Sequence, residues 1–180
     1  MAPTGIRLPT APPRPRDDAP AHVLDRPIAG LRVGLRHEGS WRSWMLILDE
    51  WERFLRRDGA IPVPLQAGGR VGAEGAETAA AVAAWAAEVD CGVSGLGTCG
   101  SCTSNSVRDA VTLEDAGKPA VVAVCEEFEA HGRNMANYLG HGRLKMLVLP
   151  YPLEARPAEE LREIAASYYP RFLDLLGAKR

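Results

Sequence analysis

The sequence predicts an α/β fold with three layers, doubly wound around a mainly parallel sheet of five strands. Short, nearly all-apolar segments alternate with longer segments of helical spacing, as they do when helices cover both faces of a parallel sheet. The chain has 180 residues, of which 46% are hydrophobic, and this is enough to bury the core of one ordinary domain. We therefore expect a single α/β domain.

The expected strands and helices alternate from residue 31 onward. Apolar runs predict strands at residues 31–35, 60–65, 89–97, 120–125 and 144–150. Helical spacing predicts helices at residues 41–58, 76–90, 104–117, 126–140 and 156–180. Gly59 follows the first helix, where a left-handed cap is commonly needed. Pro170 lacks an N–H group, so we expect the last helix to bend or split before it.

Residues 1–27 differ from the rest of the chain because they are rich in proline and poor in large apolar side chains. Such a segment cannot offset the entropy lost on folding alone. We expect a flexible arm that is either a solvated tail or a segment that orders on a partner subunit. Residues 28–180 then form the α/β domain, most simply with the flavodoxin-like (Rossmann-like) strand order 2-1-3-4-5.

Charge and hydropathy exclude two classes of partner. The formal net charge is −2, and no run of Lys and Arg is long enough to bind nucleic acid or an anionic membrane surface. No apolar stretch approaches the ~18 residues of a membrane span, and the N-terminus lacks the apolar block of a secretory signal. We therefore expect a cytoplasmic protein with a small-molecule substrate.

Two of the four cysteines lie in the segment GLGTCGSCTSNS, residues 95–106, after the third predicted strand. There Cys99 and Cys102 stand where a helix begins, and its free N–H groups and dipole stabilise a thiolate. Their spacing also allows a disulfide, as in a dithiol redox pair. The alternatives are half of a soft-metal site or a plain glycine-rich turn. Zinc would need two more ligands, and the chain has no second CxxC and no HxxxH.

Other candidate residues follow from a rule of open α/β sheets, which bind ligands beyond the carboxyl ends of the strands. His37 ends the first strand beside Arg36 and Glu38, Cys125 and Glu126 end the fourth, and Tyr151 follows the fifth. Cys91 is expected in the core, Cys125 in the core or as a third thiol, and His131 as a solvated or capping residue. The predicted catalytic residues are Cys99, Cys102, Thr103 and His37. The predicted substrate contacts are Gly97, Gly100, Ser101, Ser104, Glu126 and Tyr151.

The segment TCGSCT and the residues that follow it resemble the UGSC family over residues 29–153. Asp109, Glu114, Gly117 and Pro119 extend the match, as does the strand LKMLVLPYPL at residues 144–153. The resemblance implies that Cys99 occupies a position held by selenocysteine in some members, and it favours catalysis by Cys99 with Cys102 as the resolving thiol. Thr98 and the segment PYP at residues 150–152 depart from the family pattern, where an acidic residue and a histidine are expected.

These observations predict a thiol-dependent enzyme, most simply a cysteine-dependent oxidoreductase. Cys99 attacks a sulfur or carbon of a small molecule, and Cys102 releases the adduct by forming a disulfide. No bound cofactor is expected, and an external thiol or dithiol recycles the pair. One alternative is a protein that binds copper, zinc or mercury through Cys99 and Cys102. Another is a non-redox cysteine transferase or lyase, as one subunit of a complex assembled through the N-terminal arm or the Trp-rich helix at residues 41–58.

Overall fold

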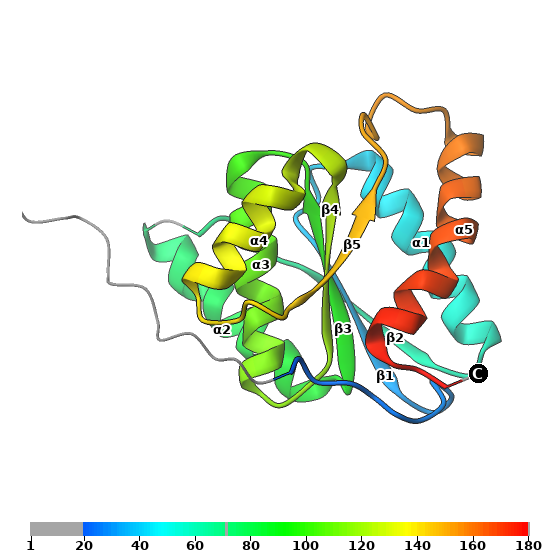
Figure 1. Cartoon of the computed structure of the whole chain (residues 1–180), viewed down its shortest axis with the longest axis horizontal. Helices are drawn as coiled ribbons and strands as arrows, with labels where there is room; N and C mark the ends of the chain where they lie inside the picture. Colours follow the sequence, from blue (N-terminus) through cyan, green and yellow to red (C-terminus); the bar gives the residue numbers. More distant parts are fainter. Residues whose placement is uncertain (1–19, 71, 180) are drawn as a thin grey trace, which may run out of the picture.

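Five parallel strands form the centre of the molecule (Figure 1). The computed structural model describes residues 20–70 and 72–179. The strands are β1 (Arg32–His37), β2 (Ile61–Gln66), β3 (Cys91–Gly97), β4 (Ala120–Cys125) and β5 (Lys145–Leu149). Their order in the sheet is β2-β1-β3-β4-β5, and every neighbouring pair is parallel. The predicted fold class and strand order are confirmed.

Helices cover both faces of the sheet (Figure 1). One face carries α1 (Arg42–Arg57) and α5 (Ala158–Leu176), and the other carries α2 (Gly72–Glu88), α3 (Gly100–Asp115) and α4 (Glu129–Tyr138). A short 3-10 helix, η1 (Glu126–Phe128), connects β4 to α4. All residues of β3 and β4 are buried, which explains their nearly uninterrupted apolar sequence. Among the described helices, none combines the length and the hydrophobicity needed to span a membrane.

Aromatic packing between α1 and α5 accounts for two of the four tryptophans. Trp51 is fully buried, stacks on Phe172 with 4.8 Å between ring centroids, and donates a hydrogen bond to the Ala165 carbonyl. Trp44 is also buried, and its indole N–H donates to the Arg36 carbonyl at 3.2 Å. Both side chains therefore belong to the core of this chain and present no surface for a partner subunit.

Two predicted helix boundaries need correction. The helix α5 is not split at Pro170: it runs from Ala158 to Leu176, and Gly177 caps it with a φ of 75°. The helix α3 begins at Gly100 rather than near residue 104, because Cys99 itself caps it. Because α3 begins at Gly100, the cysteine motif lies in the first turn of the helix rather than in a loop before it.

Part of the predicted N-terminal arm lies along the amino-terminal edge of the sheet. Leu24 N–H donates to the Leu176 carbonyl at 2.9 Å, and Lys179 N–H donates to the Arg26 carbonyl at 3.0 Å. These bonds join the segment to the end of α5. Residues 1–19, the greater part of the predicted arm, lie outside the described residues.

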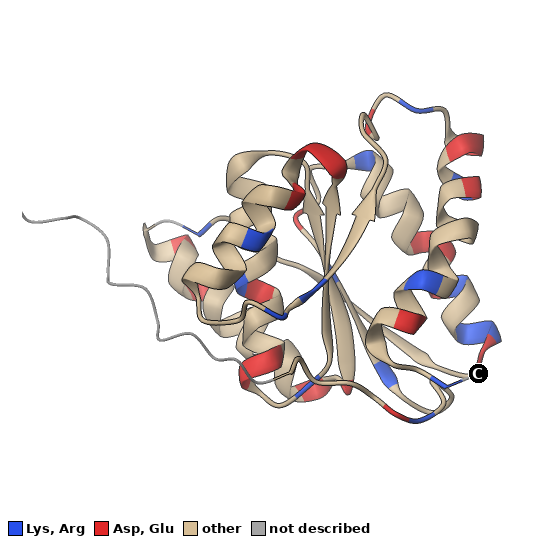
Figure 2. Ribbon diagram, viewed as in Figure 1, with Lys and Arg blue, Asp and Glu red and all other residues tan. Residues whose placement is uncertain are grey.

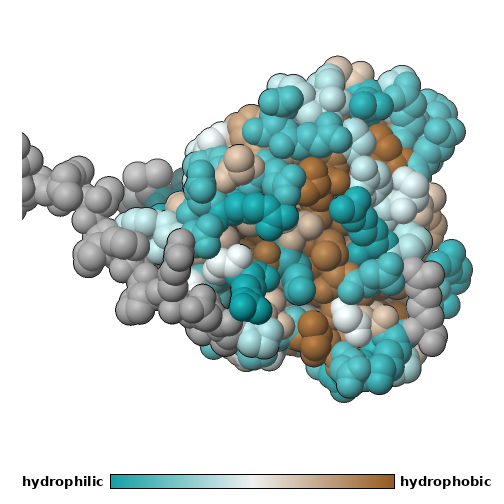
Figure 3. Space-filling view, viewed as in Figure 1, coloured by the Kyte–Doolittle hydropathy of each residue, from teal (hydrophilic) through white to brown (hydrophobic). Residues whose placement is uncertain are grey.

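The two edges of the sheet have different sequences. On the face seen in Figure 3, hydrophobic side chains gather along β5 between α4 and α5. At the opposite edge, Ile61 of β2 donates its N–H to Leu31 of the β1 side at 2.8 Å. Because N–H groups alternate in direction along a strand, those of residues 62 and 64 would point outward. Both positions are proline, Pro62 and Pro64.

Candidate functional site

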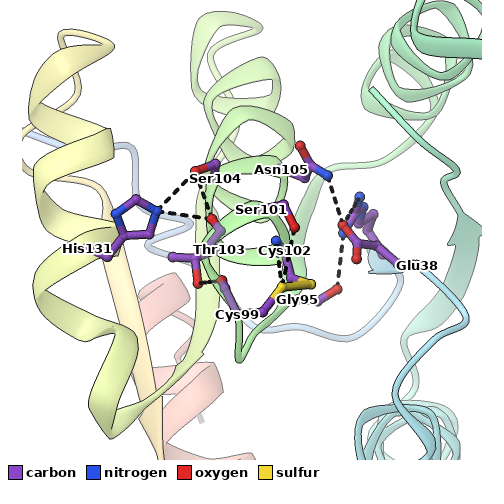
Figure 4. The surroundings of a disulfide bond; sticks show 11 residues. Glu38, Gly95, Cys99, Ser101, Cys102, Thr103, Ser104, Asn105 and His131 are labelled. Carbon is purple, nitrogen blue, oxygen red and sulfur yellow. Dashed lines mark hydrogen bonds and ion pairs between the residues drawn. A yellow bond between two sulfur atoms is a disulfide. The ribbon is translucent and has the colours of Figure 1, made fainter. Parts of the chain in front are cut away.

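The cysteine pair lies at the carboxyl edge of the sheet, where β3 turns into α3 (Figure 4). Glycines allow the close packing of this turn. A Cβ at Gly95 would lie 2.8 Å from the Trp44 ring, and one at Gly97 would lie 2.7 Å from Val124. Gly97 is buried and serves packing, whereas Gly100 is exposed and has open space in front of its Cα. Of the two glycines predicted to contact substrate, Gly100 is the accessible one.

Cys99 and Cys102 form a disulfide across the first turn of α3, with their Cα atoms 5.2 Å apart (Figure 4). Cys99 is the N-cap of the helix, and its sulfur accepts the backbone N–H of Cys102 at 3.1 Å. The Ser101 hydroxyl lies 3.5 Å from the same sulfur. Cys99 is partly exposed, whereas Cys102 is only 8% exposed. A molecule that approaches from solvent therefore meets Cys99 first.

Three polar side chains stabilise the turn that carries the disulfide. Thr103 is buried and its hydroxyl donates to the Cys99 carbonyl at 2.6 Å, so its contact is with the backbone. Ser104 donates to the Gly100 carbonyl at 2.9 Å. His131 of α4 places Nε2 3.0 Å from that carbonyl and 3.0 Å from the Ser104 hydroxyl. Since a carbonyl oxygen only accepts, the shared contact requires a proton on Nε2.

His131 thus links α4 to the start of α3, which sequence analysis did not predict (Figure 4). The sequence interpretation placed it as a solvated or capping side chain. Its ring is exposed, as expected, but it binds a helix in another part of the chain. Sequence spacing gave no signal for this contact because it depends on how α3 and α4 pack.

A buried arginine holds the other side of the motif. Arg36 of β1 has no exposed surface, and its guanidinium donates to the Gly95 carbonyl at 3.2 Å and to Glu38 at 3.4 Å. The same Glu38 oxygen accepts from the Asn105 amide at 3.2 Å. The end of β1 is therefore tied both to β3 and to the second turn of α3.

Asp109 provides the counter-ion for this arginine. Its carboxylate lies 2.5 Å from the Arg36 Nε and also pairs with Arg70, and the Asp109 side chain is fully buried. Burial lowers the pKa of Arg36, while Glu38 opposes that shift, and an arginine remains charged in either case. One signal for this cluster was present in the sequence: a charged residue inside an otherwise apolar strand needs a buried partner.

His37 lies on the opposite face of β1 from Arg36, because successive side chains of a strand alternate. It lines a hollow of about 310 Å³ with Asp49 and Glu52 of α1. Burial and the Arg36 charge lower the pKa of His37, against the two carboxylates, which raise it. No residue of the cysteine motif lines this hollow, so the structure does not place His37 in one pocket with Cys99.

The remaining cysteines are buried on the α1 face of the sheet. Burial raises the pKa of Cys91 to about 12, and burial also raises the pKa of Cys125 despite a hydrogen bond from the Thr98 side chain. Both thiols are therefore protonated and shielded at neutral pH. Within the described residues, no three or more His, Cys, Asp or Glu side chains are arranged to hold a metal ion.

Glu126 and Tyr151, two of the predicted substrate contacts, lie on the same edge as the disulfide. Gly97 pairs with Val124 in the sheet, so Cys99 and Glu126 each follow a paired position by two residues. Glu126 is exposed at the start of η1. Tyr151 is 46% exposed, and its ring contacts Phe128 edge to face, with the centroids 6.2 Å apart.

The fold and this site define a doubly wound α/β protein with a disulfide at the start of a buried helix. The model of the UGSC family matches residues 5–178, so the chain belongs to the UGSC family. The match extends beyond the segment of resemblance recognised in the sequence and includes all of α5. No curated protein matches the chain.

Proposed function

We propose that this protein is a thiol–disulfide oxidoreductase acting on a small molecule, with Cys99 as the attacking sulfur and Cys102 as the resolving one. The observation that supports this most directly is the unequal exposure of two bonded sulfurs, since Cys99 is partly exposed and Cys102 is nearly buried. The Cys102 N–H that points at the Cys99 sulfur would stabilise a Cys99 thiolate after reduction.

The proposed reaction exchanges one disulfide for another. A substrate thiolate attacks the Cys99 sulfur, the Cys99–Cys102 bond breaks, and Cys102 leaves as a thiolate that takes up a proton. A second substrate thiol then attacks the substrate sulfur of the mixed disulfide, releasing the oxidised substrate and the Cys99 thiolate. Two thiols lose two electrons and two protons, and the protein disulfide gains them. In the reverse direction Cys99 attacks a substrate disulfide, and an external thiol or dithiol supplies the electrons.

Selective alkylation tests the assignment of the attacking sulfur. We expect a limiting amount of iodoacetamide at neutral pH to label Cys99 of the reduced protein before Cys102, and to leave Cys91 and Cys125 unlabelled until the protein is unfolded. Peptide mass mapping gives the order. Labelling of Cys91 in the folded protein, or equal slow labelling of all four cysteines, would refute the site.

The Cys102→Ser variant distinguishes redox chemistry from other cysteine chemistry. We expect it to accumulate a mixed disulfide on Cys99 that is visible in the intact mass, whereas Cys99→Ser forms no adduct. The control is Ser167→Ala, which removes an exposed hydroxyl from α5 and keeps both sulfurs. Full multiple turnover by Cys102→Ser without an adduct would favour a non-redox nucleophile. Metal binding that is lost in each single variant, without turnover, would favour a soft-metal site.

A further inference from the structure

Two acidic side chains, Glu126 and Glu127, follow β4, the strand next to the one that leads to the exposed sulfur. The Thr98 side chain forms a hydrogen bond with the Cys125 sulfur, which joins the ends of the adjacent strands β3 and β4. Cys99 and Glu126 directly follow these two residues. Because neighbouring strands in a sheet are about 4.8 Å apart, the backbones of Cys99 and Glu126 start out close together. Glu126 and Glu127 are both exposed, and the structure gives neither a salt bridge among the described residues.

The other charges around the disulfide largely cancel. Arg36 and Arg70 balance Asp109 and Glu38 in the buried cluster. At the start of α4, Glu129 pairs with Arg133 at 2.6 Å. Figure 2 shows the acidic η1 at the carboxyl edge of the sheet, above the end of β4. The positive end of α3 contributes about half a charge, and the capping sulfur of Cys99 already occupies it.

We infer that the disulfide selects its small-molecule partner by charge, and that the preferred substrate is a thiol or disulfide carrying a cationic amine close to its sulfur. This inference rests on the proposed thiol–disulfide exchange and adds the class of substrate. Glu126 and Glu127 attract an ammonium group as the substrate sulfur approaches Cys99, and they repel a carboxylate. The chemistry is the exchange described above, with no further reactant.

Three small thiols of similar size measure the selection: 2-aminoethanethiol, 2-mercaptoethanol and 3-mercaptopropionate. Each is mixed with the oxidised full-length protein, quenched with N-ethylmaleimide, and the alkylated Cys99 and Cys102 are counted by mass. Each rate is divided by the rate of the same thiol with bis(2-hydroxyethyl) disulfide, which removes intrinsic differences in reactivity. We expect the corrected rates to favour the cation over the anion by about tenfold at low salt, and by much less in 1 M salt.

The double variant Glu126→Gln/Glu127→Gln locates the effect. We expect it to reduce the ratio of cation to anion rates about three- to tenfold. The rate with the neutral thiol should rise by a smaller factor, because that thiol also attacks as a thiolate and is no longer repelled. Glu77→Gln/Glu163→Gln is the matched control, because it changes the net charge equally at exposed positions on α2 and α5. We expect this control to keep the wild-type ratio.

The outcomes separate the two proposals. If the neutral thiol reduces the disulfide but all three corrected rates are equal, charge selection is wrong and thiol–disulfide exchange stands. The same conclusion follows if both double variants lower the ratio alike. If the neutral thiol does not reduce the disulfide in the folded protein, the proposed function fails, and the inference fails with it.

Discussion

The Arg36 Nε lies 2.5 Å from the Asp109 carboxylate, and both side chains are completely buried. Breaking a buried ion pair typically costs ~3–5 kcal/mol, and because Asp109 keeps Arg70 as a second cation, the loss of Arg36 should cost no more than this. We therefore expect Arg36→Met to lower the free energy of unfolding by at most this amount. Urea denaturation followed by tryptophan fluorescence measures it.

The double variant Arg36→Met/Asp109→Leu distinguishes lost charge from lost packing. Replacing both members of a buried ion pair by apolar residues is often nearly neutral. Arg70 is left without its partner in that variant, so we expect partial recovery of stability relative to Arg36→Met. A double variant as unstable as the sum of its two single variants would show that the pair contributes by shape alone.

Gly100 and Gly34 provide a contrast between accessible and packed glycines. A Cβ at Gly34 would lie 2.2 Å from the Trp85 ring. We therefore expect Gly34→Ala to lower the free energy of unfolding by about 1–3 kcal/mol, the typical cost of overpacking a core. A Cβ at Gly100 meets nothing within 4 Å, so Gly100→Ala should leave the melting temperature almost unchanged. Thermal denaturation of the two variants compares them.

Gly100→Ala also tests the predicted substrate contact. If substrate passes close to this backbone on its way to Cys99, the added methyl group slows reduction of the disulfide by a small thiol while the fold remains intact. We expect that slower rate. An unchanged rate in the folded variant would remove Gly100 from the path of the substrate.

Glu114 is expected to give the stability a measurable pH dependence. Its carboxylate is only 6% exposed and accepts the backbone N–H groups of His22 at 3.1 Å and Ala120 at 3.2 Å. Burial raises the pKa of Glu114, against these hydrogen bonds, which lower it. Because the folded state then holds the proton more tightly, the stabilisation is complete below the unfolded pKa and is lost as the pH rises through the folded pKa.

The measurement compares the wild type with Glu114→Gln in urea at several pH values from about 3.5 to 7. We expect the wild type to lose stability relative to the variant as the pH rises through this window. Gln does not titrate, so the variant should lack the part of the slope that Glu114 contributes, while it keeps one oxygen that can accept one of the two hydrogen bonds. A difference between the two proteins that is constant with pH would mean that Glu114 does not titrate abnormally.

The strand order was predictable because β3 and β4 are buried on both faces and are therefore almost purely apolar. The place of the cysteine pair, in the turn after β3, was predictable from the apolar strand and the glycines around it. Its role as helix cap was not, because caps are commonly Ser, Thr, Asp or Asn and those residues follow later in the segment. The prediction for Thr103 named a catalytic role, whereas its hydroxyl binds the Cys99 carbonyl.

His37 shows what the position of a residue in a strand can predict and what it cannot. Its place at the end of β1 was correct, and alternation along the strand puts it on the α1 face once Arg36 is known to face α3. The face that a residue takes depends on its partners across the fold. Arg36 of β1 pairs with Asp109, and Gly100 in the first turn of α3 pairs with His131; both partners lie far along the chain. Such pairs depend on helix packing, for which a single sequence carries little signal.

The prolines of β2 have a consequence for the behaviour of the protein at high concentration. An exposed strand edge normally offers alternating donors and acceptors that can recruit a strand from another molecule. At Pro62 and Pro64 the outward donors do not exist, so an incoming strand would leave its matching carbonyls unpaired. The sheet is therefore closed to growth at β2, and intermolecular β-aggregation through this edge is disfavoured even when the chain is crowded.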